Sequence, residues 1–440
     1  MKVLYNDDTH QIAIQKENCF EGLKIKLAEG IYLSGKFKKN TPSTKKIIRY
    51  MKRACVYGEE AVGSFFRKGM MNKLPVVDNR IVFGTYQNGY ACNCKYLAER
   101  IIERNLDYEL IFIVNEEVYN DYKANNIPEK VKLVRRNTFE EYYALATSKF
   151  WMDNAINCIW RRVPKKKEQY YLNAWHGSLG IKRLSGSWHW RNIAKYGDKT
   201  IDYFLTDSVF DEHVFSESFW PHADFLKVGH PRNDIFYDAD KKAELKRKVY
   251  DYYNISYDYK IVMYAPTFRD NKNDISAINI DCDKLKNAVE ERFGGKWLVM
   301  TRLHQHNARN ELTKDKFANL DNVIDAKDYP DMQELMAAVD VGITDYSSWI
   351  FDFLFTGMPA FIYAEDIDKY VNSRGFYYPL TETPFSIADS NDKLCENIRN
   401  FDDAQFKENV DEFLKARGYY GEGKACDGVI EFLKKPFRRI

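Results

Sequence analysis

Short apolar runs alternate with longer amphipathic stretches along most of this chain. Residues 341–364 are the clearest example, because an apolar run, a polar turn, an apolar segment ending at Gly357 and a second apolar run follow one another. This order predicts a strand at 341–344, a turn, a buried helix and a strand at 360–363. Two strands joined by a helix form a βαβ unit, in which the strands lie parallel.

Two series of such units follow each other along the sequence. In the first, strands are expected at 81–86, 110–114, 131–134, 150–152, 170–175 and 202–206, with helices at 95–104 and 139–147. In the second, strands are expected at 261–264, 297–300, 322–324, 341–344 and 360–363, with helices at 240–252, 285–292 and 332–339. Two C-terminal helices, at 392–414 and 425–435, would pack on one half or cross back to the first.

This alternation predicts an α/β fold with two Rossmann-like domains facing a central cleft, where ligands bind at the carboxyl ends of the strands. We divide the chain into a small N-terminal extension (1–78), an N-terminal Rossmann-like domain (79–232) and a C-terminal Rossmann-like domain that includes the C-terminal helices (233–440). Weak alternation over residues 1–34 is typical of a small hairpin or meander.

The net charge of +2 conceals a strongly basic segment at residues 35–73, which carries eleven lysines and arginines against Glu59 and Glu60. Apolar residues are interleaved with these charges. One interpretation is a set of amphipathic helices on an anionic membrane, where each cation contributes about 1 kcal/mol. The other is a solvated basic face packed on the next domain. No nucleic-acid-binding motif accompanies the charge, so nucleic acid is not an expected partner.

The remaining composition is that of an ordinary globular protein, with 45% hydrophobic and 30% charged residues. No apolar run approaches eighteen residues and the N-terminus lacks a signal-peptide pattern, which predicts a cytoplasmic protein. The eight cysteines lack the paired spacing of a zinc site and are expected to be reduced and mostly buried. The D-x-D patterns at 281–283 and 366–368 do not follow convincing strands, so no metal is predicted.

Candidate chemistry lies where the predicted strands end. Ser347 and Ser348 stand at the start of a helix, where hydroxyls and unpaired backbone N–H groups suit a phosphate, although Ser347 could simply cap the helix. His176 follows a strand and precedes Gly177, which lets a substrate approach the backbone. This is the position of a general base, although a lone histidine is more often structural.

Two further strand ends carry charged or polar side chains. Arg302 and His304 alternate along the chain after the strand at 297–300, so both could reach one anionic group. Thr267 and Arg269 lie at the tip of the strand at 261–264. At the junction of the two halves, Arg232 and Asp234 are interpreted as a structural ion pair of the hinge.

Six motifs taken together resemble the CDP-glycerol glycerophosphotransferase family, which includes the teichoic acid primases and polymerases. They lie at 175–177, 229–234, 264–270, 302–304, 344–348 and 374–377. Their order and spacing match over residues 81–435, which makes the joint signal specific. Two departures are Gln305, where the family usually has proline, and His230, where an aromatic residue is common.

The resemblance implies a GT-B fold and transfer of glycerol phosphate, or a related polyol phosphate, from a CDP-activated donor to a hydroxyl, with release of CMP. The donor would be CDP-glycerol or CDP-ribitol, bound by the C-terminal domain. The acceptor would be a teichoic-acid-like, lipid-linked or capsular glycan, bound by the N-terminal domain. The enzyme would lie on the inner face of the cell membrane, and no cofactor or metal is implied.

The resemblance also implies roles for the residues of this sequence that match the family's motifs. His176 resembles the family's base, and His304 is the second catalytic histidine implied. The residues expected to bind substrate are Arg302, Ser347, Ser348, Thr267, Arg269 and Asp345. Two rival functions stay open: a GT-B glycosyltransferase that uses a nucleotide sugar, and a non-catalytic scaffold bound to a membrane.

Overall fold

The computed structural model describes residues 3–5, 12–14, 71, 73–85, 89–120, 127–155, 163–184, 197–267, 279–303, 320, 322–367 and 375–435. The chain divides into two compact units, Met1–Lys73 and Leu74–Ile440. In the first unit, β1 (Val3–Tyr5) pairs antiparallel with β2 (Ile12–Ile14). The rest of the predicted hairpin or meander over residues 1–34 lies outside the described residues. The basic segment lies almost wholly outside the described residues, and the predicted domain boundaries stay predictions.

The first sheet of the second unit contains seven parallel strands in the order β5-β4-β3-β6-β7-β8-β9. The strands are β3 (Val77–Gly84), β4 (Glu109–Val114), β5 (Val131–Arg135), β6 (Ser148–Asp153), β7 (Tyr170–Asn173), β8 (Tyr203–Thr206) and β9 (Asp224–Lys227). The helices are α3 (Cys92–Glu103), α4 (Glu116–Asn120), α5 (Phe139–Thr147) and α7 (Val209–Ser218). The sequence did not predict β9, an edge strand without a fully buried residue.

The second sheet contains six parallel strands in the order β12-β11-β10-β13-β14-β15. They are β10 (Tyr259–Tyr264), β11 (Lys296–Thr301), β12 (Val323–Asp325), β13 (Val341–Thr344), β14 (Ala360–Tyr363) and β15 (Ser386–Ala388). The intervening elements are η2 (Pro231–Tyr237), α8 (Ala239–Tyr252), α9 (Cys282–Phe293), α12 (Met332–Ala338), α13 (Trp349–Phe353), η4 (Leu354–Thr356) and η5 (Leu380–Glu382).

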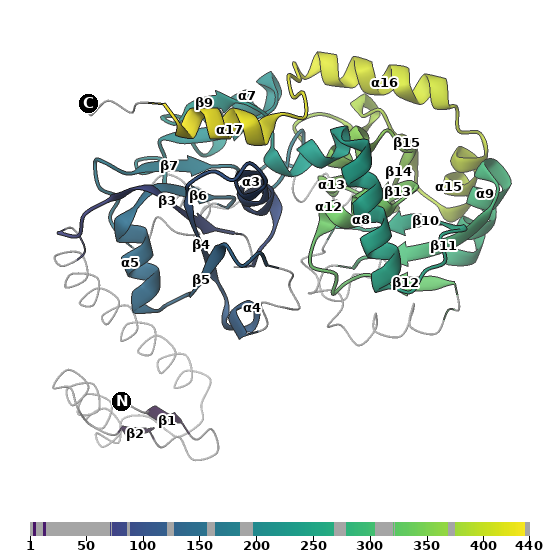
Figure 1. Ribbon diagram of the computed structural model, residues 1–440. Helices are drawn as coiled ribbons and strands as arrows, with labels where there is room; N and C mark the ends of the chain where they lie inside the picture. Colours follow the sequence, from purple (N-terminus) through teal and green to yellow (C-terminus); the bar gives the residue numbers. More distant parts are fainter. Residues whose placement is uncertain are drawn as a thin grey trace, which may run out of the picture. The chain divides into compact units, whose positions relative to one another are not determined.

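Both sheets therefore have the strand order of a Rossmann fold, and the predicted GT-B-like α/β architecture is confirmed (Figure 1). In each sheet the order reverses next to the first strand, between β3 and β6 and between β10 and β13. Ligands of such sheets bind at this switch point, outside the carboxyl ends of the strands. The residues that follow these strands are therefore the best placed to bind a ligand.

The helix after β13 is shorter than its apolar segment predicted. It comprises five residues in α13 and continues as the 3-10 helix η4, which ends at Gly357 with a φ of 74°. Gly342 of β13 is required by packing, because a Cβ atom there would lie 2.7 Å from the ring of Phe353. The helix thus packs directly on the backbone of its own strand.

The C-terminal helices pack on different halves. The region predicted as one helix at 392–414 is split into α15 (Asn391–Arg399) and α16 (Asp403–Ala416), since the Asp402 side chain caps α16. Phe406 and Phe413 of α16 join the core of the second half. By contrast, α17 (Ala425–Leu433), yellow in Figure 1, joins the core of the first half. The C-terminal helices were predicted either to pack on one half or to cross back to the first half. The structure shows the crossing, because α17 packs on the first half.

Polar contacts also join the two halves. Lys95 of α3 donates to Asp331 at 2.6 Å and to Glu334 at 2.7 Å, and all three residues are buried. A β-bridge pairs Lys182 with Phe376, within the motif at 374–377. Within the described ranges, we find no helix with the length and apolar character needed to span a membrane.

Candidate functional site

The turn after β7 carries His176 and is held in an uncommon backbone conformation. Trp175 has a φ of 48°, in the left-handed region that is costly for a bulky side chain. Buried Asn93 of α3 donates to the carbonyls of Ala174 and Trp175, at 2.8 and 3.0 Å. The Asn173 side chain accepts from the Trp175 backbone N–H at 2.9 Å. Fixed polar contacts thus offset the strain and set the direction of His176.

The contacts of His176 define its tautomer. Its Nδ1 lies 2.6 Å from the carbonyl oxygen of Asn154, which follows β6. A carbonyl can only accept, so Nδ1 carries the hydrogen and Nε2 is the basic nitrogen. Burial lowers the pKa of His176 to about 4, and the positive charges of Arg232 and Lys182 add to the lowering. The ring is therefore neutral near pH 7, as a general base must be.

Across from this turn, Ser347 and Ser348 lie between β13 and α13. Ser348 is the N-cap residue of α13, but its side chain makes no capping hydrogen bond. Neither hydroxyl is hydrogen-bonded to any other residue in the described ranges. Both hydroxyls are therefore available to a ligand, in contrast to the alternative in which Ser347 only caps the helix.

The two turns touch each other. A Cβ atom at Gly177 would lie 3.2 Å from the Ser348 Oγ, and one at Gly180 would lie 3.4 Å from the Ser348 Cβ. These glycines let the backbone beside His176 approach the second half closely. The predicted base and the predicted phosphate-binding hydroxyls, which are far apart in the sequence, are thereby brought to one place.

The other predicted residues have structural partners or lie outside the described residues. Asp345 is buried and accepts from the backbone N–H of Thr267 at 2.7 Å, which bridges the switch point between β10 and β13. Arg302 donates through one nitrogen to the carbonyls of Ala326 and Tyr329, both at 2.8 Å. A substrate-binding role for these residues stays a prediction. His304 and Arg269 lie outside the described residues.

Arg232 and Asp234 are structural residues, as predicted, but the expected pairing between them is wrong. Arg232 is buried and forms an ion pair with Asp352 of α13 at 2.8 Å. Asp234 instead accepts from the backbone N–H groups of Ala425 and Cys426 at the start of α17. The two side chains therefore attach the linker η2 to different halves.

A continuous polar frame results, because the backbone N–H of Arg232 donates to the side chain of Asn93 at 3.1 Å. The frame runs from Asp352 of α13 through Arg232 and Asn93 to the carbonyl of Trp175. The sequence did not indicate Asn93, Asn154 or Asp352 as site residues. Each lies in an ordinary helix or strand end, and only the fold brings it to the site.

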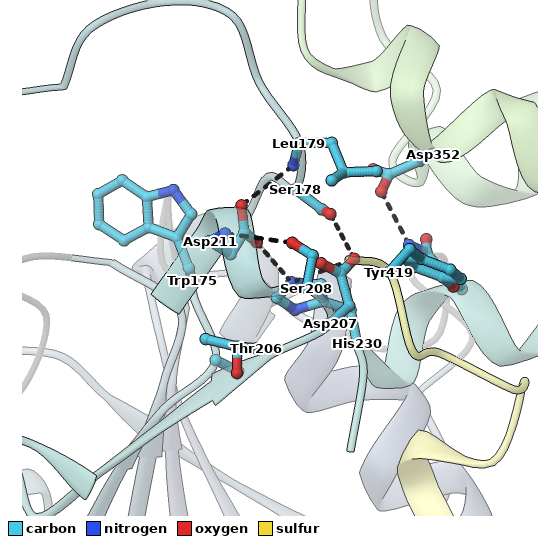
Figure 2. Close-up of polar contacts among 12 residues, drawn as sticks. Trp175, Ser178, Leu179, Thr206, Asp207, Ser208, Asp211, His230, Asp352 and Tyr419 are labelled. Atoms are coloured by element: carbon cyan, nitrogen blue, oxygen red, sulfur yellow. Dashed lines mark hydrogen bonds and ion pairs between the residues drawn. The ribbon is translucent and has the colours of Figure 1, made fainter. Parts of the chain in front are cut away.

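A buried cluster of Asp207, Asp211 and His230 lies next to Ser178 and Leu179, which follow His176 in the chain (Figure 2). Asp207 accepts from the Ser178 hydroxyl, and Asp211 accepts from the Leu179 backbone N–H at 3.2 Å. Burial raises the pKa of both carboxyls to about 7. The only sign of this cluster in the sequence was His230, which stands where the family motif commonly has an aromatic residue.

The sequence model for CDP-glycerol:poly(glycerophosphate) glycerophosphotransferases matches residues 67–435, most of the chain. The chain belongs to this glycerophosphotransferase family. The predicted family is thus confirmed, and all of the candidate residues above lie within the matched region.

Several members of the glycerophosphotransferase family are similar to this chain. A teichoic acid poly(glycerol phosphate) polymerase from Bacillus spizizenii is 28% identical over 387 residues, which is 82% of this chain and 93% of the relative. A teichoic acid glycerol-phosphate transferase from Staphylococcus aureus is 28% identical over 79% of this chain and 89% of its own length. The chain spans only 54% of the corresponding Bacillus subtilis polymerase, with 26% identity.

Solved structures agree with this membership. The wall teichoic acid polymerase TagF superposes with a TM-score of 0.70 and 25% sequence identity, over 90% of this chain and 98% of the TagF chain. A TagF variant soaked with CDPG gives a TM-score of 0.71 over the same coverage. The architecture of the glycerophosphotransferase family is therefore present over both halves.

Proposed function

We propose that this chain transfers glycerol phosphate from CDP-glycerol to a hydroxyl of a teichoic-acid-like or capsular glycan, with release of CMP. The observation that carries the proposal is the close approach of Gly177 and Gly180 to Ser348. It places the turn with a neutral, oriented imidazole against the turn with two unbonded hydroxyls. Family membership supplies the reaction class. Relatives named as glycerol-phosphate polymerases and transferases favour glycerol, while a relative named as a ribitol-phosphate polymerase keeps ribitol as an alternative.

In this proposal, His176 Nε2 removes the proton from the acceptor hydroxyl as its oxygen attacks the β-phosphorus of the donor. A new phosphodiester bond forms, and the bond between the β-phosphorus and the bridging oxygen breaks to release CMP. The hydroxyls of Ser347 and Ser348 donate to the diphosphate oxygens. Arg302 and the predicted residues His304, Arg269 and Thr267 complete the donor site, while Asp345 acts by holding the Thr267 backbone. Such catalysis consists mostly of positioning and electrostatic stabilisation.

The function is tested by CMP release from the purified chain, given CDP-glycerol, CDP-ribitol or UDP-glucose with a lipid-linked glycan acceptor. We expect acceptor-dependent CMP with CDP-glycerol and much less with CDP-ribitol. The product should contain a phosphodiester that is absent from a glycoside. UDP release from UDP-glucose with no CMP from either CDP-polyol would instead establish the rival glycosyltransferase.

The same proposal includes an anionic membrane surface as a partner, based on the charge of residues 35–73 in the sequence. Co-sedimentation with phosphatidylglycerol vesicles tests it, with phosphatidylcholine vesicles as the control. We expect binding to the anionic vesicles alone, and a loss of binding when Lys45, Lys46, Arg49 and Lys52 are replaced by glutamine. Unchanged binding by that variant would exclude this segment as the membrane-binding element.

A further inference from the structure

Three buried side chains, two from the connection between β8 and α7 and one from just before η2, converge next to the residues that follow His176. Asp207 follows β8, Asp211 lies in the first turn of α7, and His230 directly precedes η2. The His230 Nε2 lies 3.8 Å from an oxygen of Asp207 and 3.6 Å from an oxygen of Asp211. The three residues are between 1% and 3% exposed, so solvent does not reach them. Figure 2 shows the three side chains gathered at one point.

Each of these side chains has a buried polar atom without a hydrogen-bond partner in the described part of the chain. These atoms are Asp207 Oδ1, Asp211 Oδ2 and both ring nitrogens of His230. A buried polar atom left without a partner costs about 1–3 kcal/mol, so several in one cluster indicate a binding site. One ligating atom from each side chain lies within 4.8 Å of the others.

The charges of the surrounding side chains indicate that the ligand is positively charged. The cluster contains two carboxylates, and the adjacent cation Arg232 is already paired with Asp352 at 2.8 Å. A neutral imidazole brings no compensating charge. A divalent cation would balance both carboxylates and satisfy all three side chains at once.

We propose that Asp207, Asp211 and His230 bind one divalent metal ion, of which zinc fits best. Imidazole nitrogen and carboxylate oxygen are common zinc ligands, with bonds of about 2.0–2.2 Å. In a tetrahedral site such bonds place neighbouring ligand atoms about 3.3–3.6 Å apart. The observed separations of 3.6 and 3.8 Å are close to this spacing and too long for direct hydrogen bonds. Magnesium and calcium, which prefer oxygen ligands only, fit this set less well.

The proposed ion would position the turn that carries His176 without touching the reacting atoms. Ser178 donates to Asp207, and the Leu179 backbone N–H donates to Asp211, so both proposed ligands hold residues just after His176. Outer contacts of this kind orient metal ligands and are in turn oriented by them. The sequence indicated no metal here, because His230 is far along the chain from Asp207 and Asp211 and all three residues lie outside both D-x-D patterns.

The test measures metal in the full-length chain purified without chelator, by plasma mass spectrometry. We expect about one zinc per chain, and at least a tenfold decrease in the variant His230→Phe, which carries an aromatic residue as the family motif commonly does. His222→Phe is the matched control, because His222 also contacts a carboxylate, that of Asp198, but is largely exposed. Its metal content should equal that of the unaltered chain.

A second measurement does not depend on the folding of a variant. The unaltered chain is treated with a chelator, and its melting temperature is recorded with and without added zinc or cobalt(II). We expect zinc to raise the melting temperature and cobalt to give the visible absorption of a tetrahedral site. Metal content below about 0.1 per chain with no thermal shift would overturn the proposal, and shared protons would then balance the cluster. Full metal content in His230→Phe would also overturn it.

Discussion

The two turns that meet at the candidate site differ in how far the protein itself satisfies their polar groups. In the first half, the carbonyls of Ala174 and Trp175 and the Nδ1 of His176 are all bonded to protein. In the second half, the hydroxyls of Ser347 and Ser348 have no such bond within the described residues, and Ser348 makes no capping bond. These polar groups of the first turn are thus already hydrogen-bonded within the protein, whereas the two hydroxyls of the second turn can hydrogen-bond to a ligand.

This difference matches the separate tasks in the proposed reaction. A base is most effective when its direction and protonation state are fixed before the substrate arrives. A phosphate-binding group must instead exchange its water for ligand oxygens, so bonds to the protein would compete with the ligand. Changes to the first turn should therefore reduce catalysis or stability, while changes to the second should reduce donor affinity.

The largest effect is expected from His176→Ala. Loss of the proposed general base should reduce kcat by about a thousandfold while the Kd for CDP-glycerol changes little, because the proposed donor-binding residues lie in the second half. Single-turnover CMP release and calorimetric titration with the donor separate these quantities. His213→Ala, which removes an exposed histidine of α7, should leave both unchanged. A variant that loses donor binding and turnover together would argue against the base role.

The next largest effect is expected from breaking the polar frame at the ion pair between Arg232 and Asp352. Arg232→Met leaves Asp352 as a buried, unpaired carboxylate, which we expect to lower the free energy of unfolding by about 3 kcal/mol. Urea denaturation monitored by circular dichroism measures this change. The control Arg399→Met removes the partner of exposed Glu291 and should cost less than about 1 kcal/mol.

The double variant Arg232→Met, Asp352→Leu sharpens this test. If the lost stability arises mainly from the unpaired charge, the double variant should regain a large part of it. Turnover should not recover, because the hydrogen bonds that connect η2 to α13 are still missing. Full recovery of activity would show that the frame does not position the two turns.

Smaller effects are expected at the second turn. Ser348→Ala should raise the KM for CDP-glycerol by about tenfold, which corresponds to roughly 1.4 kcal/mol, and should change the stability by less than about 0.5 kcal/mol. Ser390→Ala is the matched control, because the Ser390 side chain caps α15. It should lower stability by about 1 kcal/mol and leave the KM unchanged. If Ser348→Ala costs as much stability as Ser390→Ala, its hydroxyl is already bonded within the protein.

The contrast between the turns also explains how much could be predicted from the sequence. Strands β13 and β14 and helix α5 have the predicted limits, because each is a well-marked apolar or amphipathic stretch. The edge strands β9 and β15 were missed because they are short and only partly buried. The central strands therefore followed from periodicity, whereas the length of the buried helix α13 did not.

The candidate site was predicted only in part. His176, Ser347 and Ser348 could be proposed from the sequence because each stands just after a predicted strand, and the structure brings their two turns together. Their roles stay predictions. Asn93 was missed because it acts on Trp175, 82 positions away, through the fold alone. The expected pair of Arg232 and Asp234 was wrong for the same reason, since proximity in sequence did not identify the partner that burial selects.

The smallest effect is expected in the pH dependence of kcat/KM. A base is active when unprotonated, so the rate should fall as the pH falls through the pKa of His176. Because burial lowers this pKa from about 6.5 to about 4, the decrease assigned to His176 should lie well below pH 6.5. Lys182→Gln removes one of the positive charges that lower the pKa and should move the decrease to higher pH by a fraction of a unit. Lys199→Gln, a surface change, should not move it. A decrease centred near pH 6.5, unaffected by Lys182→Gln, would mean that the imidazole is hydrated in solution and that the first turn is no more complete than the second.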